Sequence, residues 1–224
     1  MDKILKFLED LELNNKREWF LQHQEQYQSI RKSVLAIANR LIRSISDFYD
    51  LPYDLKASDC IFRINRDTRF SKDKTPYKTN FGIEITRNWK RVWLPCFYLH
   101  IQPWNASFIA GGLYMPDSKT TGKIRETINK NWKQLKKVID QILRPAWPVG
   151  RSESFYLYDD AVKTSPRWYK KDNPNIELLK LKHWIMERQV TDKEMLSVDF
   201  EKKLIQDFEK MSGFVEWLQN ALNS

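Results

Sequence analysis

The sequence predicts an α+β fold: a central antiparallel β-sheet packed against a long N-terminal helix and further helices, in a single domain spanning residues 1–224. Amphipathic stretches, with apolar residues every three or four positions, flank a middle region of short apolar and aromatic runs. The connections within that middle region are short enough for antiparallel neighbours. A hydrophobic fraction of 42% supports a packed core, and the chain contains no internal repeat or low-complexity linker.

The first third of the chain is expected to be helical. Residues 2–12 place their apolar side chains on one helical face. A second, much longer apolar stripe predicts one amphipathic helix from about Lys16 to Phe48. Asn15 followed by Glu18 fits the start of that helix, because the two side chains could satisfy free backbone amides reciprocally. Proline and turn-forming residues between 50 and 59 end it.

Four strands are expected in the middle of the chain. They are Cys60–Asn65, Asn80–Arg87, Val92–Gln102 and Ser107–Met115, which are short and rich in aromatic and β-branched residues. The pair Gly111–Gly112 inside the last of them indicates a bulge or a close approach of another backbone.

Helices dominate the expected C-terminal half. Asp117 or Ser118 could cap a helix whose apolar stripe extends to Ile142. Residues 154–163 read as one or two strands, and residues 164–177 as an irregular segment followed by helical patterns. The last helix is predicted over about Asp199 to Leu222, so that the helices complete an α+β arrangement.

Period-two alternation in the strands predicts one polar face of the sheet. The apolar residues of 81–85 and 97–101 would face the core. Arg63, Glu84, His100 and Gln102 would then gather on the opposite face, as a small-molecule site or as an ordinary solvated sheet face. Glu84 and His100 are the candidates for proton transfer, because a strand could hold the imidazole near the carboxyl group.

The charge distribution points to two basic islands. The net charge is +9, and residues 63–80 contribute +4 (six cations, two carboxylates) while residues 123–137 contribute +5 (six cations, one carboxylate). The rest of the chain is therefore neutral on balance, which favours local anion binding over general solubility. A solvated surface is the plainer interpretation of either island taken alone.

The loop after the first predicted strand carries the first island. Arginine presents forked donors that suit phosphate or carboxylate, and lysine adds a point charge. Tyr77 offers an aromatic face and a hydroxyl group, while Asp67 and Asp73 could instead pair with neighbouring arginines and tie the loop down. The cations expected to bind a ligand are Arg63, Arg66, Arg69, Lys72 and Lys74.

Standard catalytic and metal-binding motifs are missing from the sequence. It has no GxxxxGK[ST], GxSxG or HExxH pattern, and its three histidines are far apart, so no metal or cofactor is expected. Cys60 and Cys96 have no CxxC partner, which predicts reduced thiols in a cytoplasmic protein. The N-terminus lacks a secretory pattern, and no apolar run is long enough to predict a membrane span.

Several segments together resemble the family known as domain of unknown function 2461. They are "NNKREWF" at 14–20, "CIFRINRDTRFSKDKTPYKTNFG" at 60–82, "FYLHIQP" at 97–103, "GGLYMP" at 111–116 and "PRWYKKDNPNIELLKLKHW" at 166–184. The resemblance covers about residues 5–196 and implies a single α+β domain without an established activity. It adds Lys78 and Arg167 to the expected ligand-binding residues. The family often has Glu where this chain has Gln102, and His-Pro where it has Asn173-Pro174, which weakens any catalytic hypothesis.

Three functions fit these observations. The first is a cytosolic protein that binds an anionic, perhaps phosphorylated, small ligand over the sheet. The second is a non-enzymatic nucleic-acid binder that combines the basic loop with the Lys123–Lys130–Lys137 helix face and exposed tryptophans; it requires both islands on one surface. The third is an interaction module for an acidic partner, which predicts no enclosed pocket.

Overall fold

The computed structural model describes residues 1–87, 94–143 and 154–223. Within them the chain has the predicted α+β fold, built on a five-stranded antiparallel sheet with the strand order β1-β2-β3-β5-β4. The strands are β1 (Phe81–Thr86), β2 (Cys96–Ile101), β3 (Ser107–Leu113), β4 (Tyr156–Leu157) and β5 (Trp184–Val190). The helices are α1 (Asp2–Leu13), α2 (Arg17–Gln22), α3 (Gln24–Ser46), α4 (Ala57–Cys60), α5 (Ser118–Leu143), α6 (Ile176–Lys180), α7 (Asp192–Met195) and α8 (Phe200–Asn223).

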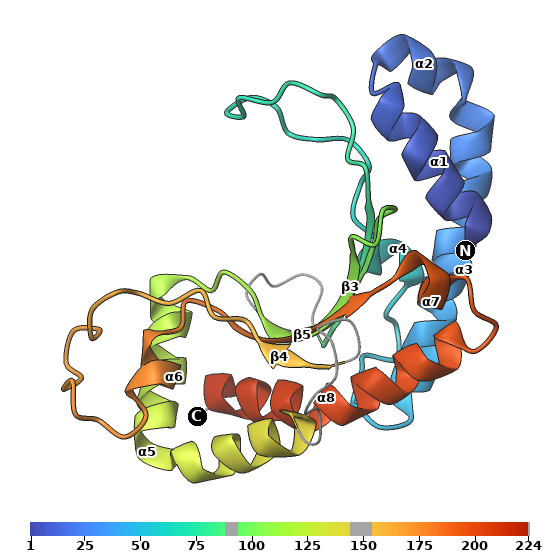
Figure 1. Ribbon diagram of the computed structural model, residues 1–224. Helices are drawn as coiled ribbons and strands as arrows, with labels where there is room; N and C mark the ends of the chain where they lie inside the picture. The colour runs from blue at the N-terminus through green and yellow to red at the C-terminus, as the bar shows by residue number, and fades with distance from the viewer. Residues whose placement is uncertain (88–93, 144–153, 224) are drawn as a thin grey trace.

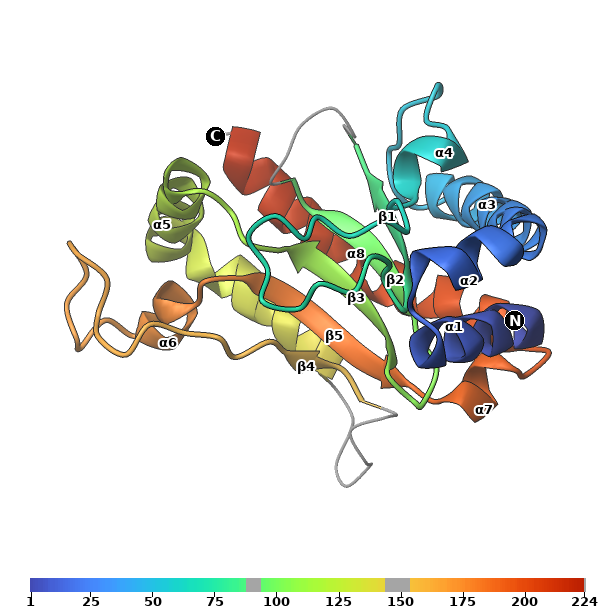
Figure 2. The ribbon, with the colours of Figure 1, turned by 90° about the horizontal axis from the view of Figure 1, so that it is seen from above.

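The helices leave one face of the sheet uncovered. Helix α8 runs beneath the sheet, with α5 beside it and α3 against the β1 side (Figures 1 and 2). Residues 61–80, which we name the arm, leave the β1 end of the sheet and extend over its other face (Figures 1 and 2). The fold therefore has two layers, the sheet and the helices on one of its faces, and its other face is open beneath the arm.

The strands β1 and β2 bury the side chains that alternation predicts. Phe81, Ile83 and Ile85 are at most 2% exposed, and the apolar residues at 97, 99 and 101 are fully buried. Each large apolar side chain buried in this way stabilises the fold by about 1.5–3 kcal/mol. These residues join helical side chains in one hydrophobic core, so the opposite face is free to carry polar groups.

The single long helix predicted over residues 16–48 is wrong. The segment forms α2 and α3, separated at His23, whose backbone (φ −106°, ψ 19°) is not helical. Asn15 does not cap α2 either, because its amide is bonded to the backbone of Tyr77: Nδ2 donates to the carbonyl at 2.9 Å and Oδ1 accepts from N–H at 3.1 Å. A tertiary contact thus replaces the local cap and fixes the base of the arm.

The strand predicted over Cys60–Asn65 is also wrong. Cys60 ends α4, and only isolated bridges follow, from Ile61 to Ile83 and from Asn65 to Tyr77. The chain touches the edge of β1 and then turns away into the arm, so it never forms a continuous ladder.

The helical patterns predicted after residue 177 correspond to the short α6 and then to strand β5. This error has a physical cause: six of the seven residues of β5 are buried, because the strand lies between β3 and β4 above α8. Burial on both faces removes the alternation that identifies a strand in sequence. The segment 154–163 contributes only the two residues of β4.

The other predicted elements agree well with the structure. Helix α5 begins after Asp117, whose side chain accepts a hydrogen bond from the Thr120 backbone at 2.7 Å, and it kinks at Asn131. Helix α8 and strand β3 have nearly the predicted bounds, whereas residues 92–93 of the third predicted strand lie outside the described residues. In the portion of the chain described, none of the helices combines the length and apolar character that a bilayer span needs.

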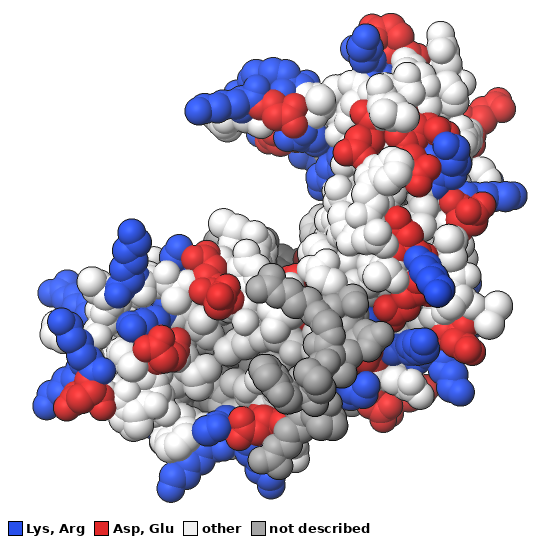
Figure 3. Space-filling model, viewed as in Figure 1, with Lys and Arg blue, Asp and Glu red and all other residues white. Residues whose placement is uncertain are grey.

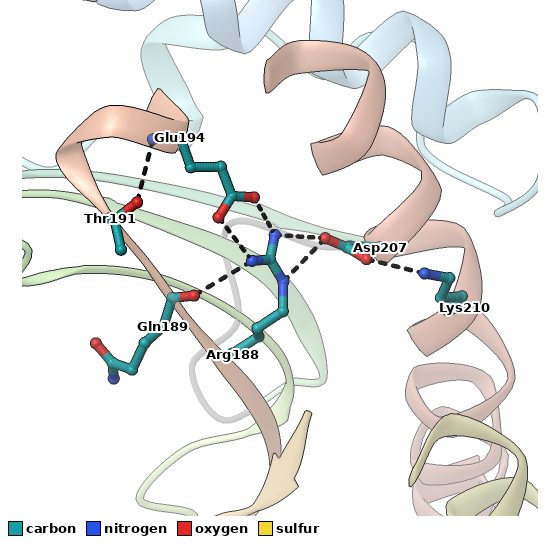
Figure 4. Close-up of polar contacts among 6 residues, drawn as sticks. All are labelled: Arg188, Gln189, Thr191, Glu194, Asp207 and Lys210. Atoms are coloured by element: carbon teal, nitrogen blue, oxygen red, sulfur yellow. Dashed lines mark hydrogen bonds and ion pairs between the residues drawn. The ribbon is translucent and has the colours of Figure 1, made fainter. Parts of the chain in front are cut away.

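An ion cluster in the core joins β5, α7 and α8 (Figure 4). The guanidinium group of Arg188 donates to Asp207 at 2.6 Å and 3.1 Å and to both carboxylate oxygens of Glu194 at 2.8 Å and 3.0 Å. Lys210 contacts the second oxygen of Asp207 at 3.2 Å. Because Arg188 is only 5% exposed, this cluster positions the elements behind the sheet and has no access to a ligand.

Candidate functional site

The uncovered face of the sheet holds a cavity of about 660 Å³. Figure 3 shows the molecule hollowed between the arm and the side that carries α5 and α6. The strand register places the wall residues in neighbouring cross-strand rows. One row is Gly82, His100, Phe108 and Gln189, the next is Glu84, Tyr98, Ala110, Glu187 and Tyr156, and the third includes Cys96, Gly112 and Ile185.

Small residues form the floor of this cavity. Ala110 and Gly112 lie between bulkier aromatic neighbours on the wall. Gly112 has φ +138°, and a Cβ atom there would lie 2.0 Å from the carbonyl oxygen of Trp184. The close backbone approach predicted for the glycine pair is confirmed at Gly112. Ala110 and Gly112 of the middle strand β3 thus leave room for the cavity between these bulkier side chains.

His100 is held in a defined tautomer. Its Nε2 lies 2.8 Å from Oε1 of Gln102, its Nδ1 lies 3.0 Å from the hydroxyl of Tyr98, and its ring stacks on Phe108 at 4.5 Å. An amide oxygen can only accept, so Nε2–H donates to Gln102 and the hydroxyl of Tyr98 donates to Nδ1. Burial lowers the pKa of His100 and raises that of Tyr98, which keeps both groups neutral.

Glu84 sits on the cavity wall beside Tyr98. Burial raises the pKa of its carboxyl group. Within the described residues the carboxyl group makes no hydrogen bond or ion pair, so its oxygens remain open to the cavity. Nearby, the thiol of Cys96 has a pKa raised by burial and by the Glu84 charge, and it has no disulfide partner. His100 and Glu84 thus share one wall, although no direct bond joins them.

A second polar group lies across the floor. The hydroxyl of Tyr156 donates to Glu187, and Nε2 of Gln189 lies 2.9 Å from Oε1 of Glu187 and 3.3 Å from the Tyr156 hydroxyl. Three side chains from β4 and β5 are therefore bonded to one another. The sequence-based prediction missed all three, because it expected helical patterns after residue 177 and gave the strand predicted within residues 154–163 no neighbour in the sheet.

His183, near the edge of the cavity, is committed to structure. Its Nδ1 accepts the backbone N–H of Met115 at 2.9 Å, and its Nε2 faces Asp160 at 3.1 Å. With one nitrogen accepting and the other donating, the ring has no lone pair left for a substrate. Its ring centroid lies 4.8 Å from that of Tyr114 and 5.8 Å from that of Tyr158, and both tyrosines line the cavity.

Local carboxylates match part of the charge of the arm. Arg66 pairs with Asp73 and contacts Thr75, while Arg69 is paired with Asp67 at 2.7 Å. Hydrogen bonds from Thr75 and then from Arg66 lower the pKa of Asp73 to about 2. A further cation, Lys74, donates to the carbonyl of Thr68 at 2.9 Å. These three predicted ligand-binding cations are used to hold the arm in shape.

The base of the arm is different. Tyr77 is buried and stacks on Phe20 at 4.0 Å, so it anchors the arm instead of orienting a ligand. The ammonium group of Lys78 lies 5.2 Å from the ring centroid of Phe62, a residue of the cavity wall. Burial, followed by the nearby charge of Arg63, lowers the pKa of Lys78. In the described part of the chain, neither Arg63 nor Lys78 has a carboxylate partner.

Other predicted residues lie away from the cavity. Lys72 is exposed on the arm, and Arg167 is exposed beside Trp168, with 4.6 Å between its Cζ and that ring. Arg167 does not line the cavity and belongs to the segment near α6. Residues 60 and 96 are free thiols, as expected. Among the described residues no group of three or more His, Cys, Asp or Glu side chains could hold a metal ion.

The second basic island is largely engaged within the fold. Lys123 donates to the carbonyl of Leu222, and Arg125 donates to two carbonyls at the end of α6. Lys130 and Lys136 pair with carboxylates four residues away on α5. The island lies across the hollow from the arm (Figures 1 and 2), whereas the nucleic-acid hypothesis requires both islands on one surface.

Comparison with known proteins adds the family. No curated protein and no solved structure matches the chain. The family model described as "Conserved hypothetical protein (DUF2461)" matches residues 3–217, which extends the resemblance seen in the sequence toward both ends. The chain therefore belongs to the DUF2461 family of conserved hypothetical proteins.

Proposed function

We propose that this protein binds a small anionic, phosphate- or carboxylate-bearing molecule in the cavity under the arm. The observation that carries the proposal is the pair Arg63 and Lys78, two cations without a carboxylate partner among the described residues, next to a cavity of about 660 Å³. A volume of this order suits a small ligand or cofactor. The ligand would bind in the cytoplasm, which agrees with two unpaired thiols.

The charge of the ligand would lie at the lip of the cavity and its body against the sheet. Among the described residues, the wall carries the carboxyl groups of Glu84 and Glu187 but no lysine or arginine, so an anion on the floor would be repelled. Lys78 lies at the Phe62 end, and Arg63 is close enough for its charge to lower the pKa of Lys78, so the two cations could neutralise an anion there. Lys78 is half-buried, and an anion beside it would restore the interaction that burial has removed.

Binding can be tested by isothermal titration with phenyl phosphate and adenosine monophosphate. We expect Lys78→Ala and Arg63→Ala each to weaken binding about tenfold or more, because a hydrogen bond to a charged group contributes about 1.5–3 kcal/mol. Lys133→Ala, which removes an exposed cation from α5, is the matched control and should leave affinity unchanged. If all three variants bind equally, or if neither phosphate binds the native protein, the proposal fails.

A further inference from the structure

Two groups of side chains at the cavity use their hydrogen-bond donors inside the protein. The Tyr98 hydroxyl donates to His100, and His100 Nε2–H donates to Gln102. On the opposite side, the Tyr156 hydroxyl donates to Glu187, and the amide of Gln189 is directed to Glu187 and Tyr156. Each of these protons therefore already has an acceptor.

Acceptors, by contrast, remain open. The carboxyl group of Glu84 has no partner among the described residues, and both bonds to Glu187 end on its Oε1, which leaves Oε2 available. Glu84 lies in the same cross-strand row as Tyr98 and Ala110, beside the floor. A carboxyl group in such a place is costly to bury unless a donor reaches it.

The surroundings of Glu84 favour a flat ligand. The rings of Tyr98, Phe108 and Phe62 line this part of the cavity, and Ala110 with Gly112 leaves room beneath them. Aromatic walls and a floor without side chains suit a planar ring system that stacks and slides between them.

We infer that the cavity selects an aromatic ligand with an amino group, which donates to Glu84 while the anionic group of the same molecule meets Lys78 and Arg63. The substrate class is therefore an amino-bearing aromatic phosphate or carboxylate, and the assignment rests on the proposed function for its anionic end. The two ends of the ligand would contact different residues: Glu84 on β1 would accept a hydrogen bond from the amino group, and the cations at the base of the arm would bind the anionic group.

Fragments that carry only the donor end separate the two parts. Benzylamine and ethylbenzene have the same ring and a similar size, but only benzylamine carries a hydrogen-bond donor, and saturation-transfer NMR detects weak binding of each. We expect benzylamine to bind the native protein and ethylbenzene to bind at least tenfold more weakly. Glu84→Met should abolish benzylamine binding without unfolding the protein, because it replaces a buried carboxyl group by an apolar chain of similar length.

Two controls complete the design. Glu84→Gln keeps one acceptor oxygen and should retain part of the benzylamine binding, whereas Glu209→Met removes an exposed carboxylate from α8 and should have no effect. Equal binding of benzylamine and ethylbenzene, or binding of neither, overturns the inference even where phenyl phosphate binds. If benzylamine binding depends on Glu84 but Lys78→Ala leaves the affinity for phenyl phosphate unchanged, the inference about the amino group is supported and the proposed anion site is refuted.

Discussion

Replacing Arg188 by methionine should destabilise the protein more than any single surface change. Its guanidinium group is 7% exposed and contacts carboxylates that are 18% (Glu194) and 9% (Asp207) exposed (Figure 4). Methionine fills the space but leaves two carboxylates close together in a buried site, with Lys210 touching only one of them. Removing one partner from a buried ion cluster costs about 3–5 kcal/mol.

This loss can be measured by urea unfolding followed by tryptophan fluorescence. If the free energy of unfolding falls by about 3 kcal/mol per molar urea, the urea concentration at the unfolding midpoint should fall by about 1–2 M. Arg40→Met is the matched control, because Arg40 makes a bidentate pair with Glu201 at the surface, where the two side chains are 51% and 36% exposed. Exposed pairs contribute less than about 1 kcal/mol.

Equal midpoints for Arg188→Met and Arg40→Met would refute the reasoning, since burial would then have no bearing on the cost. A triple variant offers a second check, in which Arg188, Glu194 and Asp207 are replaced together by apolar residues. It should recover most of the lost stability, because the penalty comes from unmatched carboxylates and not from the loss of a favourable pair.

Two further predictions concern the cavity. Gly112→Ala should lower the free energy of unfolding by about 1–3 kcal/mol through its backbone conformation alone, and by more through the contact with Trp184. Its control is Gly122→Ala in α5, where a Cβ meets nothing within 4 Å; this change should stabilise the protein by about 0.5–1 kcal/mol, and equal urea midpoints for the two variants would contradict the prediction. Burial raises the folded-state pKa of Glu84 above 4.5. The protonated carboxyl group therefore stabilises the fold fully below pH 4.5, and this contribution is lost as the pH rises through the folded-state pKa. Glu84→Gln should therefore have a higher melting temperature than the native protein at pH 7 and the same melting temperature at pH 4. A difference between the two melting temperatures that does not change with pH would exclude this explanation.

Much of the fold could be predicted because local patterns carry it. Alternation at 81–85 and 97–101 identified the buried face of two strands, and helical periodicity located α5 and α8 within a few residues. The same alternation predicted Glu84 and His100 on the polar face of the sheet, because each lies between residues of its own strand that face the core.

The rest depended on partners distant in sequence. Asn15 looks like a helix cap but bonds to Tyr77. Strand β5 lacks period-two alternation because the apolar Ile185 lies on the cavity face, while the charged Arg188 lies on the opposite face and bonds to α8. Arg66 and Arg69 looked like ligand-binding groups, yet their neighbouring carboxylates occupy them. Local sequence could suggest these pairs but could not decide between an internal partner and a ligand.

By itself, the sequence determined the α+β class, the family and the positions of the basic arm and of the polar sheet face, since each depends on residue type and spacing along one segment. Only the tertiary structure decided that Glu187, Gln189 and Tyr156 join that face and that Arg63 and Lys78 remain without a carboxylate partner in the described residues. Hydrogen bonding and charge pairing are settled over a few ångströms in space, and the strand order that brings such groups together is a property of the whole chain.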